Sequence, residues 1–274
     1  MLKALIIVAI ILVIVLGNLY LIAPNEKRDC SKFKGLMFAH RGLHEPGIPE
    51  NSPEAFRRAK AEGYGVELDV QYTADGKIVV FHDGNLSRMC GVDKKVADCT
   101  YEELMEYRLD GTEERIPLFK DVLEILQDRP LVCEIKNHNG NINDNLCRET
   151  YELLETYGGD YCIESFSPFL VKWFRDNAPE VIRGQLSCNL KEEKSLGLMA
   201  RFVISNLLVN VISRPDFLAY RHKDINKLGY KICSKLYKPL LVAWTARGEA
   251  EQVSAWKNFD SIIFEKYAND NPVE

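Results

Sequence analysis

The side chains best suited to catalysis lie close together in the first third of the chain. His40 and His82 flank a strand-like segment that carries Glu67 and Asp69. Side chains on a strand alternate between its two faces, so these two carboxylates point the same way and the apolar residues beside them point the other way. Two imidazoles next to two carboxylates suit metal-assisted attack on a phosphate ester.

A cation is expected between the carboxylates. Like charges on one wall repel each other unless a cation holds both ionised. Glu134 and Lys136 repeat the same-face pattern in the apolar segment 132–136 and add a third carboxylate. Ligand sets made only of oxygen favour magnesium, calcium or manganese over zinc. The residues predict one divalent cation, Ca²⁺ or Mg²⁺ with Mn²⁺ as a further option, held by Glu67, Asp69 and Glu134.

Each of these residues also has a structural alternative. The carboxylates could form ion pairs with Arg41 or Lys136, because structural ion-pair networks resemble active sites. His40 and His82 could be buried histidines whose ring nitrogens are satisfied. Motifs along the chain decide between these readings.

Nine short motifs occur in the order typical of glycerophosphodiester phosphodiesterases, and the chain resembles that family from residue 36 to about residue 265. The resemblance rests on their shared order, since any one of them occurs by chance. It implies a TIM (β/α)8 barrel that hydrolyses glycerophosphodiesters to glycerol 3-phosphate and an alcohol such as choline or ethanolamine. The motifs are His40-Arg41-Gly42, Pro49-Glu50-Asn51-Ser52, Glu67-Leu68-Asp69-Val70, Thr73-Ala74-Asp75-Gly76-Lys77, Val79-Val80-Phe81-His82-Asp83, Ile116-Pro117-Leu118, Glu134-Ile135-Lys136, Ser165-Phe166-Ser167-Pro168 and Trp244-Thr245.

The resemblance also implies residue roles. His40 and His82 would divide the acid and base steps, which suits a side chain that titrates near neutral pH. The nucleophile would be either the neighbouring glycerol hydroxyl, which gives a cyclic phosphate, or water. The phosphate oxygens would be held by Arg41, which offers a planar fork, and Lys136, which offers a point charge.

Other positions keep two interpretations. Trp244 and Phe166 are expected to shape the alcohol side of the pocket, with ordinary barrel packing as an equal alternative for Phe166. Glu50 belongs either to the site or to the start of a helix. Many family members end the last strand with Thr-Asp-x-Pro, whereas this chain has Ile262-Ile263-Phe264-Glu265-Lys266, so Glu265 is expected to stand in for that aspartate.

Length and charge agree with one barrel and an anchor. Barrels of this type use about 250 residues, and the chain has 274. The net charge of −5 argues against a nucleic-acid groove, which usually carries a basic stripe. We therefore expect a small-molecule phosphodiester substrate and no nucleic-acid partner.

The first 24 residues form a membrane anchor in this interpretation. The segment 4–23 is apolar except for Gly17 and Asn18, and a helix of about 20 residues crosses a bilayer core of roughly 30 Å. A cleaved secretory signal is the alternative, although the apolar run is long for one and lacks an Ala-x-Ala site. Residues 25–34 would be a tether and residues 35–274 the catalytic barrel, with an insertion at about 85–115.

The charges around the anchor favour a catalytic domain on the cytoplasmic face. Lys3 precedes the span, and four basic residues follow it within ten positions. The eight cysteines contain no Cys-x-x-Cys pair, which favours reduced thiols over a disulfide framework. One N-terminal span can also deliver its domain to the outer face of the membrane. The cytoplasmic orientation is therefore the expected one of two.

Strand-like and helix-like segments alternate along the chain, as a barrel of this type requires. Ser52 is the expected N-cap of the first barrel helix, with Pro53 as its first residue. The segment 196–213 carries both helix and strand patterns, and the count exceeds eight strands by one. The expected strands are 36–39, 65–71, 77–81, 131–135, 161–165, 182–186, 210–213, 240–244 and 261–264.

Two other functions are compatible with these residues. Since the anchor brings the pocket near lipid, a lysophospholipase D acting on lysolipids is the nearest enzymatic alternative. A non-catalytic, membrane-anchored barrel that binds phosphodiesters is the alternative from another class. It is disfavoured because binding alone does not require two histidines beside three carboxylates.

Overall fold

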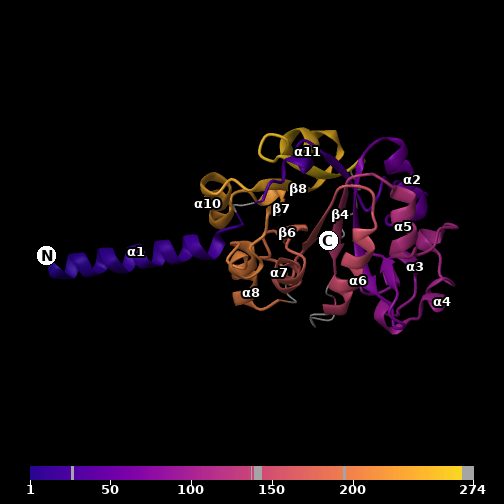
Figure 1. Ribbon diagram of the computed structural model, residues 1–274, viewed down its shortest axis with the longest axis horizontal. Coiled ribbons are helices and arrows are strands. Elements are labelled where there is room, and N and C mark those ends of the chain that lie inside the picture. Colours follow the sequence, from indigo (N-terminus) through magenta and orange to yellow (C-terminus); the bar gives the residue numbers. More distant parts are fainter. Residues whose placement is uncertain (26–27, 137, 139–143, 194–195, 267–274) are drawn as a thin grey trace.

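The computed structural model describes residues 1–25, 28–136, 138, 144–193 and 196–266. Eight parallel strands close into a barrel through the pairing of β1 with both β2 and β9, which confirms the TIM barrel (Figure 1). The strands are β1 (Met37–His40), β2 (Gly65–Tyr72), β4 (Leu131–Ile135), β5 (Tyr161–Ser165), β6 (Ile182–Ser187), β7 (Phe217–Arg221), β8 (Leu240–Arg247) and β9 (Ser261–Glu265).

The ninth strand is β3 (Ile78–Val80), which explains the extra strand in the count from sequence. It pairs antiparallel with the end of β2, with Val70 opposite Val80. β3 therefore lies beside β2 at the level of the mouth, beyond the point where β1 pairs with β2. The hairpin turns the chain back, so that Phe81 donates a backbone hydrogen bond to Asp69 and His82 follows next to the carboxylates.

Helices surround the barrel and cover its outer face. Ser52 caps α2 as expected, because its hydroxyl accepts a hydrogen bond from the Ala55 amide at 3.2 Å and Pro53 is the first helical residue. The helices after the N-terminal one are α2 (Pro53–Ala61), α3 (Ser87–Cys90), α4 (Tyr101–Leu104), α5 (Phe119–Leu126), α6 (Asp144–Glu155), α7 (Pro168–Asn177), α8 (Leu198–Ser205), α9 (Asn210–Ser213), α10 (Leu228–Leu236) and α11 (Gly248–Ala255).

Apolar side chains separate into an outer and an inner layer. The larger cluster lies between the strands and the helices and includes Leu68, Phe119 and Phe174. A second cluster fills the barrel interior with Phe38 and Phe217, and Phe33 packs against it. This division follows from strand alternation, since β2 is buried on both faces. The charged residues of the site lie at the mouth of the barrel, outside both apolar layers.

The expected strand at 210–213 is wrong, because these residues form the short helix α9. The β-branched residues Val211 and Ile212 favour a strand locally, but α9 packs against α7 and the N-terminal helix. Arg214, with a φ of 41°, ends the helix in the left-handed region. The strand of this unit is β7, which the sequence interpretation placed too early in the chain.

The segment 85–115 forms a small subdomain beside the mouth. It contains α3 and α4 and three-residue 3₁₀ turns at Val96–Asp98 and Leu109–Gly111. Its apolar residues pack into a cluster of their own that includes Leu86, Val96 and Leu104. Asp83 and Arg88 at its edge reach into the site, as described below.

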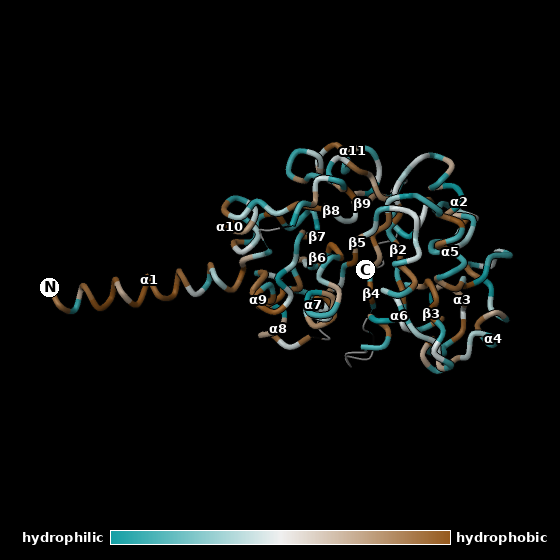
Figure 2. The backbone as a smooth tube through the Cα atoms, in the orientation of Figure 1, coloured by the Kyte–Doolittle hydropathy of each residue, from teal (hydrophilic) through white to brown (hydrophobic). Residues whose placement is uncertain are grey.

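The N-terminal helix α1 (Leu2–Ile22) extends away from the barrel as a long apolar rod (Figure 2). Nearly all its side chains are exposed, and by length and composition it is the kind of helix that crosses a membrane or serves as a signal sequence. All eight cysteines are free thiols, and only Cys90 is not buried.

Candidate active site

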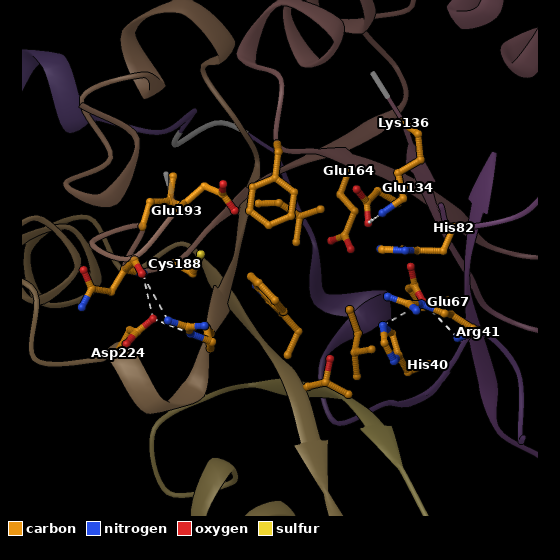
Figure 3. Close-up of a pocket in the computed structure, with 18 of the residues that line it drawn as sticks. His40, Arg41, Glu67, His82, Glu134, Lys136, Glu164, Cys188, Glu193 and Asp224 are labelled. Atoms are coloured by element: carbon orange, nitrogen blue, oxygen red, sulfur yellow. Dashed lines mark hydrogen bonds and ion pairs between the residues drawn. The ribbon is translucent and has the colours of Figure 1, made fainter. Parts of the chain in front are cut away.

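A cavity of about 640 Å³ opens at the carboxyl ends of the barrel strands, where TIM barrels place their active sites. Eight of the nine residues predicted for the site line it (Figure 3). The ninth, Asp69, is fully buried and lies directly against the others. The eight lining residues are His40, Arg41, Glu67, His82, Glu134, Lys136, Phe166 and Trp244.

The three predicted metal ligands converge. One oxygen from each of Glu67, Asp69 and Glu134 lies within 4.8 Å of the others. The register of the sheet causes this, because Asp69 on β2 is directly opposite Glu134 on β4. The cluster is composed only of carboxylate oxygens, the ligand type of Mg²⁺ and Ca²⁺.

Lys136 joins the same cluster. Its Nζ lies 2.8 Å from Asp69 Oδ1 and 2.7 Å from Glu134 Oε2. The ion pairs that were the structural alternative for these carboxylates are therefore present, and the same carboxylates also form the cluster. Burial alone would raise the pKa of Asp69, but Lys136 and other nearby cationic groups hold that pKa well below its usual value.

The remaining carboxylates have raised pKa values, because their ionised forms are only partly compensated by nearby cationic groups. Burial and the neighbouring Asp69 raise the pKa of Glu67 well above its usual value, and burial raises the pKa of Glu134 to about 7 despite Lys136. Four buried carboxylates share this region with two cationic side chains, so ionisation of all four would leave an excess of two negative charges among these six groups. A divalent cation fits that excess. The groups are Glu67, Asp69, Glu134 and Glu164 against Arg41 and Lys136.

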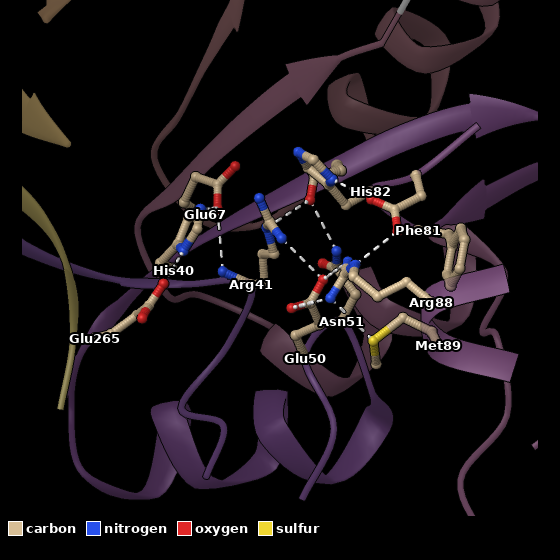
Figure 4. Close-up of polar contacts among 12 residues, drawn as sticks. His40, Arg41, Glu50, Asn51, Glu67, Phe81, His82, Arg88, Met89 and Glu265 are labelled. Atoms are coloured by element: carbon tan, nitrogen blue, oxygen red, sulfur yellow. Dashed lines mark hydrogen bonds and ion pairs between the residues drawn. The ribbon is translucent and has the colours of Figure 1, made fainter. Parts of the chain in front are cut away.

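A carboxylate from the last strand orients His40. Its Nδ1 lies 2.8 Å from Glu265 Oε1, and its Nε2 lies 3.9 Å from Glu67 Oε2 (Figure 4). Burial, followed by the charge of Arg41, lowers the pKa of His40. Although burial opposes its ionisation, Glu265 has a pKa lowered to about 2 by His40 and Arg247. Glu265 thus contacts His40 from the end of the last strand, where many family members carry the Thr-Asp-x-Pro motif.

His82 has the same arrangement on the other side. Its Nδ1 lies 2.7 Å from Asp83 Oδ1, and Arg88 Nε donates to Asp83 at 2.7 Å. Burial and the charges of Lys136 and Arg41 lower the pKa of His82 to about 4. Both imidazoles are therefore held at Nδ1 by a carboxylate, which leaves Nε2 for proton transfer.

Backbone geometry at Arg41 orders this part of the site. Arg41 has a φ of 53°, an unusual value for a residue with a side chain, and its amide donates to Glu67 Oε2 at 3.0 Å. Its guanidinium reaches Glu50 at 2.8 Å, and Asn51 Nδ2 donates to Asp69 Oδ2 at 2.8 Å. Glu50 thus belongs to the polar network of the site, while Ser52 caps the helix.

The opposite wall of the cavity has an apolar part, beside polar residues of the segment 189–193 and of the segment 221–224. Phe166 and Trp244 meet edge to face, with 5.5 Å between ring centroids and an interplanar angle of 88°. Leu186, Cys188 and Ile263 complete this wall. Trp244 Nε1 is buried without a hydrogen-bond partner among the described residues, so a polar atom of a bound molecule could accept from it.

Several contributors had no role in the sequence interpretation. Glu164 was unassigned, yet it lies opposite Glu134 in the register of β4 and β5, and its Oε2 has no hydrogen-bond partner in the described part of the chain. An acid near the end of a buried strand was the available signal. His44 and His138 lie outside the motifs that predicted the site. His44 lies beside His40 and Glu265, and His138 Nε2 lies 2.8 Å from the His82 carbonyl.

Comparison with known proteins agrees with this geometry. Residues 40–217 match the model of the Glycerophosphoryl diester phosphodiesterase family. A glycerophosphodiester phosphodiesterase of Caldanaerobacter subterraneus is 31% identical, over 65% of this chain and 78% of that protein. A lysophospholipase D of Rattus norvegicus is 31% identical, over 56% of this chain and 52% of that protein. The chain thus spans about half the length of the rat relative.

Solved structures share the fold. A phosphodiesterase of Oleispira antarctica in complex with sn-glycerol-3-phosphate has a TM-score of 0.71 at 20% identity, covering 86% of this chain and 95% of that one. A glycerophosphodiester phosphodiesterase of Thermotoga maritima has a TM-score of 0.64 at 25% identity, covering 84% and 94%. Motifs, barrel, pocket and relatives agree, and the chain belongs to the glycerophosphoryl diester phosphodiesterase family of phosphodiester-hydrolysing enzymes.

Proposed function

We propose that the protein hydrolyses glycerophosphodiesters to glycerol 3-phosphate and an alcohol, with His40 and His82 as the acid and base. The observation that carries this proposal is the matched pair of imidazoles. Each is held at Nδ1 by a carboxylate, and each lines the same cavity beside the carboxylate cluster. One Nε2 takes a proton from the nucleophile, and the other gives a proton to the leaving alcohol oxygen.

A divalent cation, Ca²⁺ or Mg²⁺ with Mn²⁺ as a further option, is proposed to bind Glu67, Asp69 and Glu134. When bound, it withdraws charge from the phosphate and orients the glycerol hydroxyls. Arg41 and Lys136 line the cavity and are proposed to hold the phosphate oxygens. The nucleophile is either the neighbouring glycerol hydroxyl or water, and detection of a cyclic phosphate distinguishes the two.

The test is a panel of glycerophosphodiesters assayed for glycerol 3-phosphate release, with and without chelator. We expect release from several alcohols, loss of activity with chelator, and recovery when Ca²⁺ or Mg²⁺ is returned. Activity that is insensitive to chelator would contradict the metal site. A metal-loaded protein that hydrolyses no member of the panel would support the non-catalytic binding barrel instead.

Lysophospholipase D activity is the second candidate. The apolar wall of Phe166 and Trp244 and the helix α1 favour a lipid-borne substrate, and the rat relative carries that name. Comparison of hydrolysis rates for glycerophosphocholine and lysophosphatidylcholine distinguishes the two activities. Preference for the lysolipid would make it the main substrate class.

We also propose that residues 1–24 remain as an uncleaved membrane anchor, followed by a tether at 25–34 and the barrel at 35–274, with the insertion at 85–115. The intact mass of protein purified from membranes tests cleavage. For the side of the membrane, we propose the cytoplasmic face. Labelling of a Glu102→Cys variant with an impermeant thiol reagent on intact cells should then fail, and labelling before lysis would contradict this orientation.

A further inference from the structure

The end of α1 is attached firmly to one side of the barrel. α1 meets the domain between α8 and α10 (Figure 1). Asn210 Nδ2 donates to the Ile22 carbonyl at 2.8 Å, Tyr237 Oη donates to the Leu19 carbonyl at 2.9 Å, and Arg214 Nη1 donates to the Ala23 carbonyl at 2.7 Å. These bonds fix α1 against the domain. If α1 crosses a bilayer, the surface around its base must face that bilayer.

Exposed apolar side chains gather on the two helices beside this base. Among the described residues that follow α1, eight large hydrophobic side chains are exposed, and five of them belong to α8 and α10. On α8, Leu198, Met199 and Phe202 are 79%, 75% and 60% exposed. Their spacing of one, three and four residues places them on one face of the helix. Leu228 and Leu236 are the exposed pair on α10.

α10 also carries positive charge next to its apolar stripe. Leu228 and Leu236 are exposed, Ile232 between them is partly buried against the core, and a row of lysines accompanies the exposed pair. Within the described ranges, none of these lysines forms an ion pair with an acidic side chain, although the whole chain has a net charge of −5. An apolar stripe beside lysines is the pattern of helices that lie in a membrane interface. The lysines are Lys227, Lys231, Lys235 and Lys238.

α10 packs closely against the residue that follows α8. A Cβ atom at Gly229 on α10 would meet the backbone oxygen of Asn206, just after α8, at 2.2 Å. Only glycine permits this close contact between the two segments. Tyr20 at the base of α1 is 66% exposed, with the Arg214 guanidinium 4.5 Å from its ring centre, and interfacial tyrosines and arginines typically mark the level of the headgroups.

We propose that this α8/α10 face (Leu198, Met199, Phe202, Leu228, Leu236 and the four lysines) docks on the surface of an anionic phospholipid bilayer beside α1. The proposal rests on the anchor included in the proposed function. The apolar side chains enter the boundary between headgroups and acyl chains, and the lysines bind anionic headgroups. An anionic bilayer explains both the lysines of the α8/α10 face and the position of this face beside α1.

Docking would bring lipid close to the active site. The loop between β6 and α8 lines the cavity with residues 188–193, and Arg221 and Asp224 before α10 line it as well. Both docked helices therefore begin within about five residues of segments that line the cavity. A phosphodiester carried in the bilayer would reach the site from this side.

The direct test is fluorescence quenching in nanodiscs that hold the full chain. An environment-sensitive probe is attached at Leu198→Cys in a Cys90→Ser background, and at Glu102→Cys on α4 as the control at the far end of the domain. Nitroxide-labelled lipids should quench the probe at 198 and not the probe at 102. Equal and weak quenching at both positions would overturn the proposal. A concentration-dependent blue shift in detergent without quenching by lipid would also overturn it, in favour of a second copy of the chain.

A separate variant tests how much the lysines of α10 contribute to docking. Lys231→Glu with Lys235→Glu should weaken quenching at position 198 in discs that contain phosphatidylserine and have little effect in discs of phosphatidylcholine alone. An Lys120→Glu variant on α5 provides a matched change of a lysine outside this face. The same loss of quenching in that control would overturn the electrostatic part.

Activity separates failure of docking from failure of the proposed function. Leu198→Ser with Phe202→Ser should leave hydrolysis of glycerophosphocholine in solution unchanged and should lower hydrolysis of lysophosphatidylcholine in discs several-fold. If neither substrate is hydrolysed by the unaltered protein, the proposed function fails while quenching still decides docking. If quenching is absent but both substrates are hydrolysed, docking fails alone.

Discussion

The two walls of the cavity differ in composition and in the way they are held. The wall from β1, β2 and β4, together with Glu164 of β5 and Glu265 of β9, is a dense ionic network in which buried carboxylates, histidines and cations contact one another at 2.7–3.0 Å. The wall near β6 and β8 has a large apolar part, and Phe166 packs on Trp244 there. The first wall requires defined distances between charges, whereas the second requires only shape.

This difference indicates a division of labour that we expect in a phosphodiesterase. The phosphate and the glycerol are common to all glycerophosphodiesters, so rigid charged groups can bind this constant part of the substrate. The alcohol varies, and an apolar wall can accommodate variation without leaving a buried charge unpaired. Substitutions in the ionic wall should therefore affect all substrates alike, and substitutions in the apolar wall should affect them unequally.

The largest effect is expected at the histidines. His40→Ala or His82→Ala should lower kcat by roughly 100- to 10,000-fold for every substrate, because general acid–base catalysis is lost. Binding of the divalent cation, measured by calorimetry, should remain. His222→Ala is the matched control, since His222 does not line the cavity. Unchanged hydrolysis in either variant would refute the assignment of roles.

Glu265 tests whether the ionic wall depends on charge at a particular pH. Its pKa is lowered from 4.5 to about 2, so its ionised form stabilises the folded state above pH 4.5, and this stabilisation is lost as the pH falls toward 2. The shift corresponds to at most about 3 kcal/mol. In urea unfolding followed by fluorescence, Glu265→Gln should be less stable than the unaltered protein at pH 7, and the difference should shrink toward pH 2. A difference that does not vary with pH would argue against this ion pair.

Glu134→Gln should weaken metal binding. Loss of one carboxylate from the cluster should lower affinity for Ca²⁺ or Mg²⁺ by at least about 10-fold, the scale seen even for indirect partners of ligands. Titration calorimetry on chelator-treated protein measures this affinity. Glu152→Gln on the exposed face of α6 is the control. Equal affinities in the two variants would remove Glu134 from the metal site.

The smallest effect is expected on the apolar wall. Trp244→Ala removes an edge-to-face contact, which corresponds to roughly a 2- to 10-fold change in kcat/KM. The change should differ among choline, ethanolamine and unsubstituted glycerol as leaving alcohols. Trp256→Ala, at a partly exposed position on the surface, controls for loss of a tryptophan. An identical loss for all alcohols would place Trp244 with the phosphate-binding groups instead.

The parts of the fold that sequence could predict are those set by local patterns. The alternation in β2 and the Ser52-Pro53 helix start depend on neighbouring residues, and both occur where the sequence predicts them. The strand predicted at 210–213 was wrong, because the short helix α9 that forms there depends on packing against α1 and α7. Composition alone favoured a strand there.

The candidate site shows the same limit. The nine motifs of the resemblance identified eight residues that line the cavity. They could not show that Glu265 contacts His40, a pair separated by 225 positions, because that contact forms only when β9 closes the barrel on β1. Glu164 was missed for the same reason, since its proximity to Glu134 depends on the register of two strands.

The β2–β3 hairpin has a consequence for how the enzyme folds. Its strands are joined by residues 73–77, whereas successive strands elsewhere in the barrel are linked through helices. Contacts between residues near in sequence form fastest, so we expect the hairpin to be among the first tertiary structures to appear. It carries Glu67 and Asp69 and leads into His82, while His40 meets Glu265 only at ring closure. About half of the proposed catalytic and metal-binding residues would thus come together early in folding. The active site would be complete only when the last strand closes the barrel.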